Sequence, residues 1–183
     1  MKTVVFFGSA RKNGNTKDLL NSFLTNLEGS VEIIDAYRSE ISPCIDCRYC
    51  WKKRGCSIDD KMQKIYPLID KADNIVFATP VYFGNIPGPL KNIIDRCQVY
   101  WASTLRDDKF EKGSKKGIMF LCGGAPSFEN QFTATEMVLE GLFGDLGAFT
   151  AGKVYVPNTD EVPVKENFRA KDKAGEIAKN LRR

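Results

Sequence analysis

The sequence predicts an α/β fold in which helices cover both faces of a five-stranded parallel sheet. Short runs rich in β-branched and aromatic residues alternate with longer amphipathic runs, and glycine, proline and asparagine separate them. Parallel strands need long crossovers, and the crossovers here have helical periodicity. We therefore expect a three-layer, doubly wound arrangement with strand order 2-1-3-4-5, whose ligand site lies at the carboxyl ends of the strands.

The five expected strands are short runs rich in β-branched and aromatic residues. They are residues 3–7, 31–35, 74–78, 117–122 and 153–156. The first expected helix has an apolar face of Leu19, Leu20 and Phe23, and prolines open the third. The five expected helices are residues 15–27, 59–71, 87–99, 132–146 and 164–181.

The length of 183 residues suits one domain, residues 1–183, with a cysteine-rich loop at residues 42–58. Hydrophobic residues make up 43% of the chain and charged residues 27%, which is ordinary for a globular protein. The apolar runs are too short to cross a bilayer, and the first leads directly into a glycine turn, so we expect a cytoplasmic protein without a signal peptide. The net charge of +4 is mild, and no nucleic-acid-binding motif is present.

The sequence contains no histidine. This absence excludes Ser-His-Asp and Cys-His catalysis, zinc sites with histidine ligands and acid–base chemistry by histidine. The chemistry of the protein must then come from a cofactor, a thiolate or a carboxylate.

The segment that joins the first strand to the first helix has the composition of an anion-binding loop. Free backbone N–H groups and the helix dipole favour an anion there. Gly14 permits a tight turn, Arg11 supplies a charged donor, and neutral donors come from Ser9, Asn15 and Thr16. There is no G-x-G-x-x-G, and no lysine follows Gly14, so hydrolysis of a nucleoside triphosphate is not expected. The alternative is that these residues only turn the chain and cap the helix.

Two further loops at the same edge of the sheet suit a flat ring. A planar heterocycle such as an isoalloxazine needs apolar walls, close backbone approach and a few polar groups along its edge. The third strand runs into a segment that combines these features: Pro80, Val81, Tyr82, Phe83, Gly84 and Asn85. The fourth strand is followed by Gly123 and Gly124. Packing alone could explain Tyr82 and Phe83, but three such loops together favour a binding site.

Four of the six cysteines are crowded into one short segment. They are Cys44, Cys47, Cys50 and Cys56. Without a secretion signal, metal or redox use is favoured over disulfides. Two C-x-x-C steps in tandem are similar to the ligation of a [4Fe–4S] cluster in ferredoxins and unlike zinc knuckles separated by a long spacer. Zinc and free thiols remain alternatives, whereas Cys97 and Cys122 are expected to be buried structural residues.

The motifs around residues 8–16 and 80–85 resemble those of the flavodoxin-like NADPH-dependent FMN reductase family, and within it the iron–sulfur flavoproteins. The likeness covers residues 3–122. It implies that Ser9, Arg11, Asn15 and Thr16 hold the FMN phosphate. It further implies that residues 80–85 contact the ribityl chain and ring, that Gly123 and Gly124 lie by the pyrimidine side, and that homodimers or homotetramers cover the flavin.

From this resemblance we expect an FMN-dependent NAD(P)H oxidoreductase that passes electrons to a small-molecule or protein acceptor. A [4Fe–4S] cluster, where present, would relay single electrons. We assign no general acid or base, because the flavin carries the chemistry. Two other functions are considered: a non-enzymatic electron carrier of the flavodoxin type, and a zinc-stabilised interaction domain whose loops are only turns.

Overall fold

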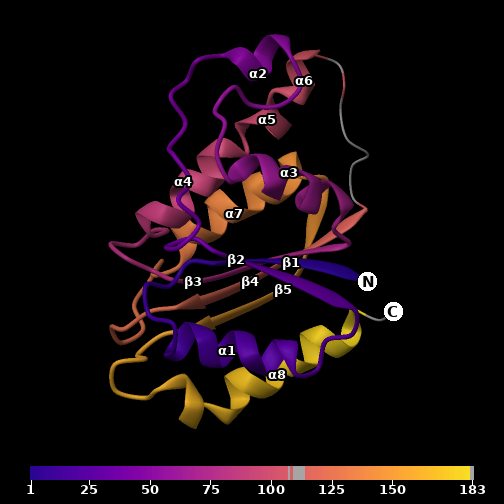
Figure 1. Cartoon of the computed structure of the whole chain (residues 1–183). Helices are drawn as coiled ribbons and strands as arrows, with labels where there is room; N and C mark the ends of the chain where they lie inside the picture. The colour runs from indigo at the N-terminus through magenta and orange to yellow at the C-terminus, as the bar shows by residue number, and fades with distance from the viewer. Residues whose placement is uncertain (107, 109–113, 182–183) are drawn as a thin grey trace.

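The computed structural model describes residues 1–106, 108 and 114–181, and it contains a five-stranded sheet (Figure 1). The strand order is β2-β1-β3-β4-β5 and all neighbouring strands are parallel, so the predicted order is confirmed. The strands are β1 (Lys2–Phe7), β2 (Ser30–Asp35), β3 (Asn74–Pro80), β4 (Lys115–Cys122) and β5 (Ala148–Val156).

Helices form a layer on each side of the sheet (Figure 1). One face is covered by α1 (Asn15–Leu24) and α8 (Phe168–Asn180), which follows the short 3₁₀ helix η1 (Val164–Glu166). The other face is covered by α3 (Met62–Lys71), α4 (Gly88–Arg96) and α7 (Thr133–Asp145). No helix in the described part of the chain is long and apolar enough to cross a membrane.

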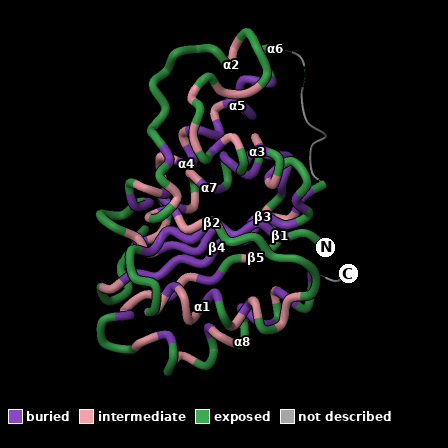
Figure 2. The backbone as a smooth tube through the Cα atoms, in the orientation of Figure 1, coloured by how far each residue is buried: buried purple, intermediate pink, exposed green. Residues whose placement is uncertain are grey.

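The core is divided between the two faces of the sheet. In β1, Val4 and Phe6 point into one layer, whereas Val5 and Phe7 point into the other. β3 and β4 alternate in the same way, so the three central strands are buried on both faces, as Figure 2 shows in purple. This two-sided packing fixes the carboxyl ends of the strands and, with them, the loops that form the candidate site.

The cysteine-rich segment projects from the α3–α4 side of the molecule (Figure 1). It contains one helical turn, α2 (Tyr49–Lys52), which packs against α5 (Gln98–Trp101) and α6 (Ser103–Arg106). The rings of Trp51 and Trp101 meet at a centroid distance of 5.9 Å and join the segment to α5. The expected loop at residues 42–58 is therefore packed on the helices that follow α4.

Several element boundaries differ from the sequence prediction. The first helix ends at Leu24 rather than at residue 27, and the expected helix at residues 87–99 is broken after Arg96. β5 begins at Ala148 rather than at residue 153. Gly152 interrupts the run of strand-forming residues there, which is why the sequence pattern placed the start of the strand too late. In the structure Gly152 packs closely against α8, because a Cβ at this position would lie 2.7 Å from Cγ2 of Ile177.

Candidate functional site: a cleft at the strand ends and a cysteine pocket

The loop between β1 and α1 is held close to the neighbouring strand. The Gly8 N–H donates to the Ala78 carbonyl at 2.8 Å, and a Cβ at Gly8 would lie 2.6 Å from Cδ2 of Leu90. Gly14, which precedes α1, has a φ of 142°, a conformation that favours glycine. Ser9 is buried, and its Oγ accepts the Arg11 N–H at 3.3 Å. The loop thus brings the N-terminus of α1 and its unsatisfied N–H groups to the strand ends.

Asn15 joins this loop to the segment that follows β5. Its Nδ2 donates to the Thr159 carbonyl at 3.1 Å, and its Oδ1 accepts the Val164 N–H at 2.8 Å. The amide therefore has a structural role that the sequence analysis did not foresee, in addition to its place on the cleft. The backbone around Thr159 is held against the start of α1 as a result.

The segment after β3 separates into a part on the cleft and an exposed turn. Val81 continues the sheet pairing, because its N–H donates to the Cys122 carbonyl at 2.8 Å. Tyr82 and Asn85 then exchange two backbone hydrogen bonds of 2.9 and 3.0 Å. Between them Phe83 has a φ of 50° and Gly84 a φ of 73°, which defines a tight turn of the type I′ class. The Phe83 side chain is fully exposed.

The loops after β4 and β5 are bonded to one another. Gly123 accepts hydrogen bonds from the N–H of Thr159 at 3.0 Å and from its hydroxyl at 3.2 Å. A Cβ at Gly123 would lie 2.7 Å from Nε2 of Gln131, and one at Gly124 would lie 2.5 Å from Oδ2 of Asp160. A side chain at either glycine would therefore displace the side chain that faces it.

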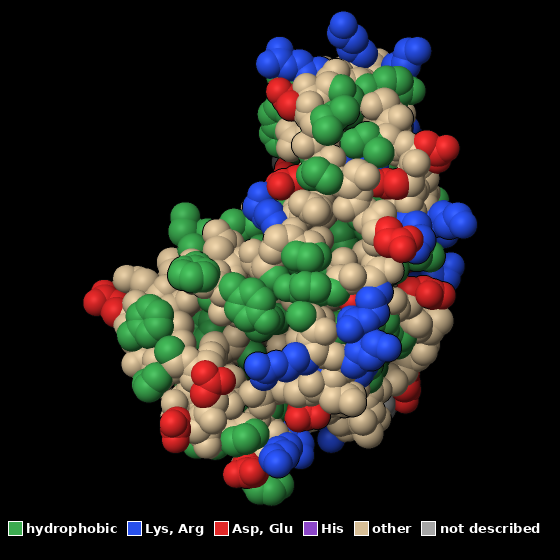
Figure 3. Space-filling view, turned by 60° about the vertical axis from the view of Figure 1, so that its left-hand side comes forward, with side chains coloured by type: hydrophobic (Ala, Val, Ile, Leu, Met, Phe, Trp, Pro, Cys, Tyr) green, Lys and Arg blue, Asp and Glu red, His purple; other side chains and the backbone are tan. Residues whose placement is uncertain are grey.

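These loops enclose a cleft of about 290 Å³ at the carboxyl ends of the strands, close to the lower end of the range for small-molecule sites. Figure 3 faces this edge of the molecule. Nine predicted residues line the cleft: Ser9, Arg11, Gly14, Asn15, Thr16, Pro80, Val81, Tyr82 and Gly124. The other predicted residues of these loops, Phe83, Gly84, Asn85 and Gly123, are not among its lining residues.

Three lining residues were missed by the sequence analysis: Cys122, Thr159 and Asp160. Thr159 and Asp160 follow the carboxyl end of β5, at the same edge of the sheet as the predicted loops. The rule that ligands bind at the carboxyl ends of parallel strands would therefore have found them as well. Burial raises the pKa of Cys122 to about 12, although a hydrogen bond with Thr16 acts in the opposite direction. Cys122 therefore presents a neutral thiol to the cleft.

The four clustered cysteines line one narrow pocket of about 20 Å³, together with residues of α2 and with Arg96, Gln98 and Val99. Cys44 and Cys47 are exposed, and Cys50 and Cys56 are half-buried. Within the described residues no group of three or more histidine, cysteine, aspartate or glutamate side chains is arranged to hold a single metal ion.

The thiols of the pocket differ in their surroundings. The Ser57 hydroxyl lies 3.2 Å from Cys47 Sγ, and this hydrogen bond lowers the pKa of Cys47. Burial raises the pKa of Cys50, and the neighbouring thiols raise it further. Cys50 therefore lies close enough to the other three thiols for them to influence its pKa.

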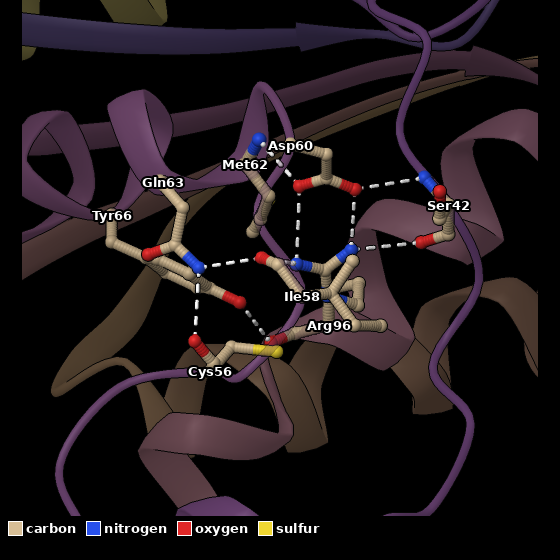
Figure 4. A network of polar contacts seen from close by, with 8 residues as sticks. All are labelled: Ser42, Cys56, Ile58, Asp60, Met62, Gln63, Tyr66 and Arg96. Atoms are coloured by element: carbon tan, nitrogen blue, oxygen red, sulfur yellow. Dashed lines mark hydrogen bonds and ion pairs between the residues drawn. The ribbon is translucent and has the colours of Figure 1, made fainter.

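A buried ion pair holds both ends of the cysteine-rich loop (Figure 4). Arg96 donates to both carboxylate oxygens of Asp60, at 2.7 and 3.1 Å, and also to the Ser42 carbonyl at 3.0 Å. Asp60 in turn accepts the Ser42 N–H at 3.0 Å. Burial alone would lower the pKa of Arg96, but the bonded Asp60 carboxylate and the nearby Tyr66 and Cys56 raise it. The pair is therefore charged, and it fixes the loop to the end of α4.

Known proteins resemble this chain in sequence and in fold. An iron–sulfur flavoprotein from Methanocaldococcus jannaschii is 34% identical over 128 residues, which cover 68% of this chain and 62% of that protein. This chain matches only 47% to 62% of the length of three such curated relatives.

Two solved structures show the common fold. The NAD(P)H:quinone oxidoreductase from Methanothermobacter marburgensis superposes with a TM-score of 0.71 at 20% identity, covering 100% of this chain and 96% of that one. The FMN-dependent NADH-azoreductase from Bacillus anthracis in complex with FMN gives a TM-score of 0.70 at 16% identity, with both chains covered fully. The sequence model of the NADPH-dependent FMN reductases matches residues 1–159. Because this match spans most of the sequence, the chain belongs to the NADPH-dependent FMN reductase family.

Proposed function

We propose that this chain is a cytoplasmic flavoprotein that binds FMN in the cleft at the strand ends and reduces it with NAD(P)H. The observation that carries the proposal is the cleft itself, which combines the N-terminus of α1, the Arg11 guanidinium and the loops after β3 and β4. Bound FMN supplies hydride acceptance and one-electron transfer. The protein residues bind and orient the cofactor.

The phosphate is assigned to the loop between β1 and α1. Ser9 and Thr16 offer hydroxyl donors there, and the first turn of α1 offers N–H groups that have no acceptor within the helix. Arg11 is exposed at the mouth of the cleft, so its charge is available to an entering anion. The Asn15 amide contributes by holding the Thr159 segment in place, because its oxygen is already bonded.

The ring is assigned to the space between the loops that follow β3 and β4. Pro80, Val81 and Tyr82 give this space an apolar wall, and Gly124 leaves the backbone accessible. Asp160 is the carboxylate on this lining, and we assign it to the polar edge of the bound ring system. Phe83 and Phe128 are exposed on the same two loops, which supports a homodimer or homotetramer in which a second subunit covers the flavin.

We further propose that the four clustered cysteines hold a [4Fe–4S] cluster that relays single electrons between the flavin and an outside acceptor. Four thiols around one pocket are the donor set of such a cluster. Cys44 and Cys47 are exposed, so their thiols are accessible to an entering cluster. The relatives named iron–sulfur flavoprotein support this assignment.

One experiment tests the reductase function. The protein is purified without oxygen, loaded with FMN and mixed with NADH or with NADPH while the flavin absorbance is followed. Bleaching by either nucleotide is expected. Tight FMN binding without bleaching by either would support the electron-carrier function instead, and absence of FMN binding would overturn the assignment of the cleft.

A second experiment tests the cluster. Iron, sulfide and zinc are measured on protein purified without oxygen, together with Cys47→Ser and Cys97→Ala variants. About four irons per chain are expected in the wild type and in Cys97→Ala, because Cys97 lies outside the pocket, and fewer in Cys47→Ser. One equivalent of zinc, or no metal, would contradict the proposal.

A further inference from the structure

Arg96 has a buried N–H group without an acceptor. Its side chain has 0% exposure, and its two Nη atoms donate to Asp60, Ser42 and Ile58. Its Nε has no hydrogen-bond partner in the part of the chain that the structure describes. Leaving a buried donor unsatisfied is costly, and more so when the group is charged, so such groups are rare and call for a partner.

The place of Arg96 indicates what that partner is. Arg96 lines the pocket formed by the four cysteines, whereas Asp60, which occupies its other nitrogens, is not among the lining residues. Arg96 therefore borders the pocket, whereas Asp60 lies outside its lining, and the Arg96 guanidinium is close enough to Cys56 for that thiol to influence its pKa. Sulfur atoms of an iron–sulfur cluster accept hydrogen bonds, and such bonds tune the reduction potential.

We propose that Arg96 is a positioning residue that sets the reduction potential of the cluster by donating its Nε–H to a cluster sulfur or to Cys56 Sγ. The inference rests on the proposed cluster at Cys44, Cys47, Cys50 and Cys56. One-electron reduction adds one negative charge to the cluster and transfers no proton. A fixed cation beside the cluster stabilises that added charge, so Arg96 raises the potential.

A second cation on the same pocket provides the matched control. Arg48 also lines the pocket, but its side chain is 61% exposed and its guanidinium lies 4.8 Å above the Trp51 ring. Water screens an exposed charge much more strongly than a buried one. Loss of the Arg48 charge should therefore shift the potential much less than loss of the Arg96 charge.

The test is a redox titration of the cluster, followed by electron paramagnetic resonance on protein purified without oxygen. Iron and sulfide are measured first. Arg96→Gln should make the potential more negative, and Arg96→Lys should give a smaller shift, because it keeps the charge but loses the Nε–H. Asp60→Asn should shift the potential in the opposite direction, since it removes the counter-ion. Arg48→Gln should have little effect.

The signs of the shifts distinguish tuning from mere support of the loop. If Arg96 only supported the loop, Arg96→Gln and Asp60→Asn would damage the cluster alike and show no opposite shifts. Unchanged potentials in cluster-loaded Arg96 variants would overturn the inference.

A measurement on protein with an intact Arg96 covers the case in which its variants do not assemble. The Arg48→Gln protein is labelled with ¹⁵N at the arginine Nε, and a ¹⁵N hyperfine coupling to the reduced cluster is expected. Absence of the coupling in an iron-loaded sample would overturn the role of Arg96. Absence of iron and sulfide from the wild type would overturn the proposed cluster, and the inference with it.

Discussion

Arg96 and Asp60 form a two-point ion pair that lies at the base of the cysteine-rich loop. The Arg96 side chain is 0% exposed and that of Asp60 is 12% exposed. Asp60 also accepts the backbone N–H groups of Ser42 and Met62, each at 3.0 Å. The pair therefore connects the beginning of the loop, its end and the last turn of α4.

Removal of the Asp60 charge should destabilise the protein. Asp60→Asn leaves a buried guanidinium without its counter-ion, which costs about 3–5 kcal/mol. The measurement is urea unfolding at neutral pH. Asp95→Asn is the control. It removes an exposed ion pair between Asp95 and Lys91, both on α4 like Arg96, and should cost less than about 1 kcal/mol. Equal effects of the two substitutions would contradict the assigned role of the buried pair.

The contribution of the pair should depend on pH. Burial opposes ionisation of Asp60, but its hydrogen bonds with Arg96, Ser42 and Met62 lower its pKa below the unfolded value, which is about 3.9. Its stabilisation is therefore complete at neutral pH and is lost as the pH falls below about 4 toward the folded pKa. The difference in unfolding free energy between wild type and Asp60→Asn should shrink over that interval. A difference that stayed constant would show that Asp60 does not titrate there.

Arg11 should act on the phosphate of the cofactor and not on its ring. Arg11→Met should weaken FMN binding about tenfold, because an exposed charge-assisted hydrogen bond is worth about 1.5 kcal/mol. Riboflavin, which lacks the phosphate, should bind both proteins equally. Lys12→Met is the matched control, because Lys12 is a neighbouring exposed cation that does not line the cleft. Titrations of flavin fluorescence measure all of these affinities, and an equal loss of riboflavin binding would refute the assignment.

Asn15 should contribute to stability as well as to binding. Asn15→Ala removes the two hydrogen bonds with Thr159 and Val164 and should cost about 1–2 kcal/mol in unfolding free energy. The affinity for FMN should fall in parallel as the segment after β5 loosens. Asn21→Ala, at an exposed position of the same helix, should leave FMN affinity unchanged and should not lower stability, because alanine favours the helix. Unfolding curves and FMN titrations on both variants measure these quantities. If Asn15→Ala weakened FMN binding but left stability unchanged, the Asn15 side chain would act on the ligand alone.

A side chain at Gly124 should disturb the cleft through Asp160. The Cβ of Gly124→Ala would lie 2.5 Å from Oδ2 and 2.9 Å from Cγ of Asp160, so that carboxylate must move. Because Asp160 is exposed and its carboxylate can turn away, we expect a loss of less than about 1 kcal/mol in stability but weaker FMN binding. Gly141→Ala, in the open middle of α7, should instead raise stability by about 0.5–1 kcal/mol. Thermal unfolding with and without FMN measures both effects, and an unaltered FMN affinity in Gly124→Ala would argue against a ligand beside that loop.

The sheet and its order could be predicted because strong local patterns determine them. Residues 4–7 are apolar at every position, and a parallel sheet with helices on both faces buries such a run. The order of the strands then placed the loops after β1, β3 and β4 at one edge, where nine of the predicted residues line the cleft.

What escaped prediction depends on contacts between distant parts of the chain. Asn15 was identified as a donor for a ligand, but its bonds to Thr159 and Val164 span more than 140 residues and have no local sequence pattern. Phe83 was expected in the site, yet the tight turn after Tyr82 directs it into solvent. Arg96 falls within the expected helix at residues 87–99 and was not singled out, because its burial depends on Asp60 and Ser42, which precede it on another segment.

The bond between Asn15 and Val164 also determines when the cleft can be completed during synthesis. The two residues are 149 positions apart, so the start of α1 leaves the ribosome about 7–30 s before its partner segment. Until that segment arrives, the nascent chain carries the phosphate loop without the wall formed by Thr159 and Asp160. Cofactor capture should therefore be a late event of biogenesis, and a chain released early, before Val164, would present the loop sequence without a finished cleft.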